Sequence, residues 1–160
     1  MITKISGGEG QHFSVVNVNL TWKVRAEDVS GDFCFFEQTL QVGEGVPPHH
    51  HGYAESFYVL QGELVFVGGD GLEVPCRRGD VVIAKAGTSH AFYNHGTEVG
   101  RLLSISVGPH QSFFDAVAAA DRQAPFASMT PVEAMKHIAS IGQTTDTHFV
   151  WPNASEPVQD

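Results

Sequence analysis

The stretch PPHHHGYAESFYVLQGEL, residues 47–64, decides how the rest of the chain is interpreted. Three consecutive histidines and a glutamate stand in it just before apolar residues in a pattern typical of a β-strand. An internal run of histidines has three explanations: a cloning remnant, a solvated loop or a set of metal ligands. The spacing of the surrounding residues distinguishes these three explanations. Only a metal site requires a further ligand elsewhere in the chain.

Short apolar or alternating runs, interrupted by glycine, extend from Val15 to Val107 and predict an all-β fold. The run 33–42 has apolar residues at its even positions, the period of a half-buried strand, although Phe33 and Phe35 blur the alternation. The sequence GGDG at 68–71 predicts a tight hairpin turn. The expected strands are 20–24, 33–42, 57–61, 63–67, 72–76, 80–84, 90–94 and 101–107, which together favour an antiparallel sandwich or barrel.

The pattern changes after Gly108-Pro109. The segment SFFDAVAAADR predicts a helix with Ser112 as its N-cap. We therefore expect a β-barrel domain over residues 1–110, two helices packed on it over 111–142, and an extended tail over 143–160. The helices either cover the outside of the barrel or form a lid over its mouth.

The second helix has clear end signals. Thr130 is the expected N-cap, Pro131 the first helical residue, and Glu133 completes a capping box. Gly142 is placed to end the helix. The apolar stripe expected to face the barrel is Val132, Met135, Ile138 and Ile141.

Charge and composition exclude several partners. The formal net charge of −9 would repel a phosphate backbone, and the basic residues form no block, so nucleic acid is not expected. No run approaches the roughly 20 apolar residues that a membrane span needs, and the N-terminus lacks an apolar signal region, so we expect a cytoplasmic protein. Cys34 and Cys76 are expected as free, buried thiols.

Residues of equal parity in a strand face the same side, and His49, His51 and Glu55 share parity. His50 would then point away from them. The run TSHAFYN places His90 on one face of another strand, which a barrel can bring opposite the first. Three imidazoles and one carboxylate would converge, a set that suits a divalent Fe, Mn, Co, Ni, Cu or Zn ion rather than calcium.

The spacings resemble those of the cupin superfamily. Its first motif is matched by Gly43, His49, His51, Glu55 and Gly62. Its second motif is matched by Gly79, Gly87, His90 and Asn94, with Lys85 where proline is usual, and residues 63–78 separate the two motifs. The resemblance implies a small antiparallel jelly-roll barrel that binds one transition-metal ion per chain through His49, His51, Glu55 and His90. Gly62 and Gly87 would serve as turn residues, and Asn94 as a structural hydrogen-bonding group.

The chain is also loosely similar to single-domain bacterial cupins of the quercetin 2,3-dioxygenase type. That resemblance implies a metal-dependent oxidoreductase, a dioxygenase that uses O₂ on a small enolisable or aromatic, flavonol-like substrate. Glu55 would be both ligand and catalytic base. The alternatives are a metal-dependent isomerase or lyase and a non-enzymatic small-molecule binding or sensing module. Edge strands of such barrels pair readily, so a homodimer is expected.

The remaining histidines and the aromatic residues have simpler expected roles. His12, His95, His110, His137 and His148 are expected at the surface, although His110 could line a barrel mouth. The aromatic residues Phe36, Phe57, Phe66 and Phe92 are expected in the core, where one or two would also wall a pocket.

Overall fold

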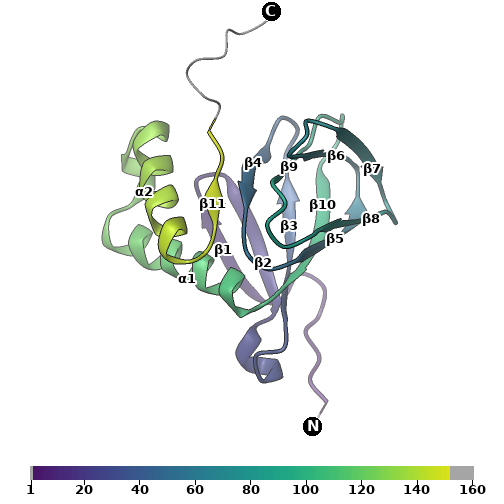
Figure 1. The fold of residues 1–160 in the computed structure, drawn as a ribbon. Coiled ribbons are helices and arrows are strands. Elements are labelled where there is room, and N and C mark those ends of the chain that lie inside the picture. Colours follow the sequence, from purple (N-terminus) through teal and green to yellow (C-terminus); the bar gives the residue numbers. More distant parts are fainter. Residues whose placement is uncertain (1, 152–160) are drawn as a thin grey trace, which may run out of the picture.

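The computed structural model describes residues 2–151 of the chain and consists of two antiparallel sheets and two C-terminal helices (Figure 1). The first sheet, sheet A, has the strand order β1 (Gln11–Val15), β2 (Val18–Val24), β3 (Cys34–Leu40), β10 (Gly100–Ser106), β5 (Glu55–Gln61) and β8 (Val81–Ala84). The second, sheet B, has the order β11 (His148–Phe149), β4 (Gly45–His50), β9 (His90–Tyr93), β6 (Glu63–Gly68) and β7 (Glu73–Arg77). The helices are α1 (Gly108–Gln123) and α2 (Pro131–Thr144), with short 3₁₀ turns η1 (Ala26–Val29) and η2 (Phe126–Ser128).

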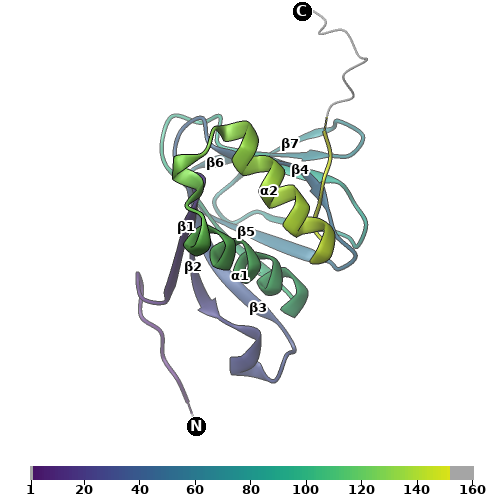
Figure 2. The same ribbon diagram turned by 90° about the vertical axis from the view of Figure 1, so that its left-hand side faces the viewer.

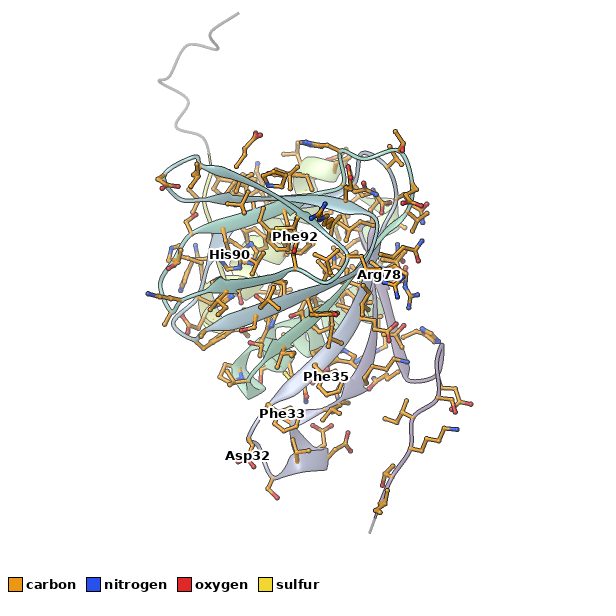
Figure 3. The ribbon with its side chains drawn as sticks, turned by 90° about the vertical axis from the view of Figure 1, so that its right-hand side faces the viewer. Asp32, Phe33, Phe35, Arg78, His90 and Phe92 are labelled. Carbon is orange, nitrogen blue, oxygen red and sulfur yellow. The ribbon has the colours of Figure 1, made fainter. Side chains whose placement is uncertain are left out.

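The two sheets pack face to face as a jelly roll, which confirms the all-β prediction. Alternate residues of their strands point inward, as the strictly alternating burial of β3 illustrates. Figure 3 shows His90 and Phe92 between the sheets, whereas Phe33 and Phe35 lie near the start of β3. The core between the sheets is made of Leu40, Phe57, Val59, Leu64, Phe66, Cys76, Ala84, Phe92 and Leu102. The pairing does not close into a complete barrel, because β1, β8, β11 and β7 remain sheet edges.

The helices α1 and α2 cover the part of sheet A that contains β1, β2 and β3 (Figure 2). A second core fills the space between them, with Phe13, Trp22 and Phe36 on the sheet side. Phe113, Val117 and Ile138 complete this second core from the helices, and all three are buried. In residues 2–151, neither helix has the length and hydropathy needed to cross a membrane.

Hydrogen bonds attach the first turn of α1 to η1, the 3₁₀ turn that follows β2. The buried side chain of Gln111 accepts a hydrogen bond from the backbone N–H of Ala26 at 2.7 Å and donates one to Glu27 at 2.8 Å. One turn further along α1, Asp115 forms an ion pair of 2.6 Å with Arg25. These contacts fix the position of the residues that begin α1.

The turn and capping predictions fit the structure. Gly71 has a φ of +76° in the β6–β7 hairpin, a backbone conformation that favours glycine, and its N–H donates to the carbonyl of Gly68. The Thr130 hydroxyl accepts from the N–H of Glu133, whose carboxylate accepts from the N–H of Thr130, so the capping box is formed. Cys34 and Cys76 are free and buried.

Three strands lay outside the predicted set, each for a physical reason. Strand β1 is joined to β2 through Val16 and Asn17, both at positive φ, without the glycine that usually marks such a turn. Strand β4 contains Pro47 and Pro48, which lack N–H groups, and its pairing with β9 shifts register between Val46 and His49. Strand β11 is only two residues long and pairs with β4, so the predicted tail contributes to sheet B. Residues 152–160 of that tail lie outside the described residues.

The helix boundaries also differ from prediction. Helix α1 begins at Gly108, with Pro109 in its first turn, and Ser112 donates to the carbonyl of Gly108 instead of capping the helix. Helix α2 continues past Gly142 to Thr144. On this helix Val132 is 64% exposed, so it does not belong to the buried stripe.

Replacing Gly142 with alanine should destabilise the fold. A Cβ atom on Gly142 would lie 2.0 Å from the carbonyl oxygen of Thr147, a contact that only a backbone shift relieves. Alanine gains about 1 kcal/mol of helix propensity, but we expect the steric cost to exceed it and leave a net loss of roughly 1–3 kcal/mol. Thermal unfolding measures this effect, at about 2–4 °C per kcal/mol for a domain of this size. The matched control is Gln143→Ala at an exposed neighbour, and equal unfolding temperatures for both variants would contradict the prediction.

Candidate metal centre

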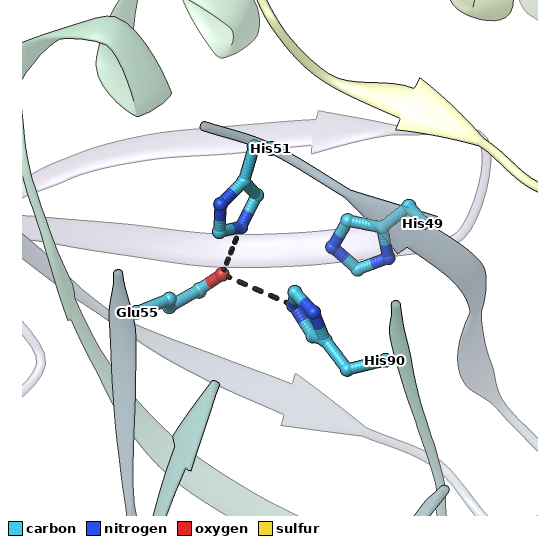
Figure 4. A group of neighbouring side chains, drawn as sticks. All are labelled: His49, His51, Glu55 and His90. Carbon is cyan, nitrogen blue, oxygen red and sulfur yellow. Dashed lines mark hydrogen bonds and ion pairs between the residues drawn. The ribbon is translucent and has the colours of Figure 1, made fainter. Parts of the chain in front are cut away.

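The structure brings together the four residues named from the sequence (Figure 4). His49 lies at the end of β4 directly opposite His90 of β9, while His51 follows β4 and Glu55 begins β5. One possible ligand atom from each residue lies within 4.8 Å of all the others. All four side chains are buried, with exposed fractions of 6% or less. The fold therefore brings donor side chains from both sheets, on β4 and β9 of sheet B and on β5 of sheet A, to one point in the interior.

Backbone carbonyls fix which ring nitrogen of each histidine faces the cluster. The Nδ1 atoms of His49, His51 and His90 lie 2.9, 2.7 and 2.9 Å from the carbonyls of Pro47, Tyr53 and Thr88, each two residues away in sequence. A carbonyl oxygen only accepts hydrogen bonds, so each Nδ1 must donate. In the neutral ring the Nε2 lone pair is then free, which is the arrangement of a metal-ligating histidine.

The two carboxylate oxygens of Glu55 have different neighbours: Oε2 faces two of the clustered histidines, and Oε1 faces Ser104 and His110. Its Oε2 lies 3.1 Å from Nε2 of His51 and 3.5 Å from Nε2 of His90. Its Oε1 accepts a 2.5 Å hydrogen bond from the hydroxyl of Ser104 and lies 3.8 Å from Nδ1 of His110. Burial opposes ionisation, but His110 and the contacts with His51, His90 and Ser104 hold the pKa of this carboxyl well below its ordinary value. Glu55 is therefore a carboxylate.

The donor set fits a bound cation. Burial, together with the neighbouring His90, lowers the pKa of His49 to about 3, so that this ring is neutral. Nε2 of His90 is buried and has no hydrogen-bond partner among the described residues. The lone pair of the neutral His49 ring and the carboxylate of Glu55 repel one another in a dry interior unless a positive charge lies between them. Burial opposes protonation of His90, but its contact with Glu55 raises the pKa of that ring above its ordinary value.

The two sequence motifs are joined by hydrogen bonds and stacking around His51. The N–H of Gly87, which has a φ of +76°, donates to the carbonyl of His51 at 2.7 Å. Tyr53 stacks on the ring of His51 with centroids 4.0 Å apart. The N–H of Gly52 donates to Asp146 in the segment after α2 at 2.9 Å. The histidine loop is thus held both by the jelly roll and by the C-terminal segment.

Asn94 and Gly62 have the structural roles that the motif implied. The amide of Asn94, fully buried, donates to the carbonyls of Leu40 and Glu98 at 3.0 and 2.9 Å, and its oxygen accepts from Gly96. Gly62 has a φ of +75° in the turn between β5 and β6. These residues shape the strand ends without contacting the cluster.

Two further residues contact or approach Glu55: Ser104 was not predicted, and His110 was considered only as a residue that could line the barrel mouth. Ser104 is a polar residue at an inward position of β10, and that parity was the available signal in the sequence. His110 was expected at the surface, yet it is 4% exposed, and its ring packs against Phe36 and Phe114 with centroids 5.7 and 5.1 Å away. The prediction was wrong because α1 begins four residues before the expected cap, which turns His110 inward.

The other histidines lie away from the cluster. His50 points to the opposite side of β4, where its ring is 5.1 Å from that of His148. His148 in turn lies 3.4 Å from Asp146. His12, His95 and His137 are exposed. His50 therefore lies outside the cluster that contains His49 and His51, as alternation along a strand predicts.

Comparisons with known proteins agree with this fold. Residues 36–106 match the family model described as Cupin domain. An oxalate-binding protein of Thermotoga maritima is 35% identical over 74 residues, which are 46% of this chain and 60% of that relative's length. The aligned part thus spans less than two thirds of that curated relative.

Two solved structures share the fold. The crystal structure of a predicted oxalate decarboxylase of Thermotoga maritima has a TM-score of 0.61 at 26% identity and covers 66% of this chain and 98% of its own. A polyketide cyclase of Streptomyces resistomycificus has a TM-score of 0.62 at 19% identity, over 68% of this chain and 80% of its own. These findings do not show a likeness to quercetin 2,3-dioxygenases. The chain has a jelly-roll fold, its residues 36–106 are similar to a Cupin domain, and the comparisons support the cupin superfamily.

Proposed function

We propose that this protein is a metal-dependent cupin oxidoreductase, a dioxygenase that acts on a small enolisable or aromatic substrate. One observation carries the proposal: four buried donor groups, His49, His51, Glu55 and His90, converge within 4.8 Å. Two of them, His49 and Glu55, also line a cavity of about 350 Å³. A cluster of ligands beside an interior cavity is the arrangement of a catalytic metal site rather than a closed structural one.

The chemistry of the donors limits the metal. Three imidazole nitrogens and one carboxylate oxygen suit Fe, Mn, Co, Ni, Cu or Zn, whereas calcium and magnesium prefer oxygen ligands. A bound ion of this kind would polarise a substrate oxygen, and a redox-active one would also engage O₂. The hydrogen bonds from the three Nδ1 atoms to backbone carbonyls would hold each ring in its ligating orientation.

Glu55 is the proposed base. Ser104 holds its Oε1 by a 2.5 Å hydrogen bond, which leaves Oε2 on the side of the histidines. From there Oε2 would accept the proton of a substrate hydroxyl and leave an electron-rich enolate for oxidation. A dioxygenase places both atoms of O₂ in the organic product, so this reaction needs no external reductant.

The alternative is a non-enzymatic binding protein. It is favoured by the Thermotoga maritima relative, whose name describes binding and not catalysis. A metal-dependent isomerase or lyase would use the same donors and Glu55 without consuming O₂. Measuring oxygen uptake by metal-loaded protein with a panel of enolisable and aromatic compounds separates the dioxygenase from both alternatives.

Metal binding should depend on two of the three adjacent histidines. The double change His49→Ala and His51→Ala removes two of four donors, so we expect it to abolish binding of one transition-metal ion per chain. Elemental analysis of protein purified without a histidine tag, after reconstitution, measures the metal content. The control His50→Ala should bind metal like the parent chain, because His50 faces away. Absence of metal from the parent chain, or equal losses from the three single changes, would overturn the assignment.

The change Glu55→Gln tests the second role of this residue. Glutamine keeps the size and one oxygen donor but lacks basicity. We expect the variant to retain much of its metal while turnover falls on the order of 10²-fold or more, the usual effect of losing a general base. Turnover is compared at equal metal occupancy. Full activity of the variant would limit Glu55 to coordination.

A further inference from the structure

The cavity beside the donor cluster extends well beyond the cupin domain. It lies between the inner face of β1–β3 and the helices α1 and α2. Phe13 and Val15 line it from β1, Val117 from α1, and Met135 and Ile138 from α2. All five residues lie outside the span 36–106 that matches the Cupin domain model. A segment that is not part of the family match therefore shapes the space in which a substrate would lie.

The walls of this cavity carry no positive charge. No lysine or arginine is found among the described residues that line it, and its acidic residues are Glu44 and Glu55. Most of the lining is aromatic or aliphatic. A small dianion such as oxalate would find no side-chain cation here, so only a metal ion at the donor cluster would pair its charges, and the apolar walls would contribute nothing to its binding.

The cavity reaches the donor cluster. His49, Glu55 and His110 line the cavity there, and Nδ1 of His110 is buried without a hydrogen-bond partner in the described part of the chain. The other polar residues that line the cavity are Asn17, Gln38, Glu44 and Thr147. The part of the lining that α2 contributes is apolar and consists of Met135 and Ile138. A volume of about 350 Å³ corresponds to roughly a dozen water-sized groups, about twice the non-hydrogen atoms of oxalate. The shape therefore suits a ligand with one polar end and a large apolar body.

We propose that the substrate has an uncharged hydrophobic body of roughly a dozen or more non-hydrogen atoms. This body lies between sheet A and the C-terminal helices, where Met135 is a specificity-determining residue. The substrate's polar end faces His49, Glu55 and His110. This inference rests on the proposed function for the identity of the site, but the binding of an apolar ligand can be measured without metal or turnover.

The test uses 2-naphthol, an uncharged bicyclic alcohol, as the probe and oxalate as the competitor. Fluorescence anisotropy of 2-naphthol is recorded with the full chain, first metal-free and then metal-loaded. We expect binding of 2-naphthol in both states and no displacement by an equal concentration of oxalate. Binding of oxalate in preference to 2-naphthol in both states would overturn the inference.

Substitution of Met135 tests the location. The change Met135→Trp fills the cavity and should weaken 2-naphthol binding at least about tenfold, while metal content stays at the parent level. The control Val132→Trp adds the same side chain to the exposed face of α2, where Val132 is 64% exposed, and should leave binding unchanged. Met135→Gln, similar in size but polar, should also weaken binding, and it serves if the tryptophan variant does not fold. Unchanged affinity in a folded Met135 variant would overturn the assignment.

The outcomes distinguish this inference from the proposed function. If 2-naphthol binds through Met135 but no compound in the panel causes oxygen uptake, the cavity assignment stands and the dioxygenase proposal fails. If oxygen is consumed with small charged acids, and Met135→Trp leaves that activity intact, the oxidoreductase proposal stands and the cavity assignment fails.

Discussion

A carboxylate buried among imidazoles is the constraint on which the site depends. Glu55 is 3% exposed and ionised, and three histidines surround it with their Nε2 atoms. Removing such charges and lone pairs from water is costly unless they are compensated. Ser104 satisfies one carboxylate oxygen, and three backbone carbonyls satisfy the three Nδ1 atoms. The other ring nitrogens of the three histidines and the second oxygen of Glu55 face one point. A divalent cation at this point would offset the cost of burying all four groups.

The fold supports this arrangement from several directions at once. Pairing of β4 with β9 sets His49 opposite His90, and β10 carries Ser104 beside Glu55 of β5. The N–H of Gly87 binds the carbonyl of His51, and Asp146 binds the loop at Gly52. The C-terminal helices then enclose the space next to the donors, so that the jelly roll positions the reactive groups while α1 and α2 form much of the cavity. Both parts of the chain thus shape the candidate site.

The sequence predicted the donors because strand parity and motif spacing are local properties. His49, His51 and Glu55 lie within seven residues, and alternation alone separates them from His50. The Thr130 capping box was equally local, and it predicted the start of α2. His110 and the cavity were not predictable in this way. Both depend on how α1 packs. Gln111 and Asp115 fix that packing through contacts with Ala26 and Arg25, at the start of the turn η1 and more than 80 residues earlier in the sequence. The end of α2 was missed because tertiary contact between Gly142 and Thr147 overrides the usual role of glycine as a helix terminator.

The most direct measurement is anomalous X-ray diffraction at the absorption edge of the reconstituted metal. We expect one strong peak per chain between His49, His51, Glu55 and His90, about 2.0–2.2 Å from each ligating nitrogen and oxygen atom. We also expect that Nδ1 of each histidine still contacts its backbone carbonyl. A strongest peak at the exterior pair His50 and His148, or no peak inside the jelly roll of reconstituted crystals, would contradict this expectation.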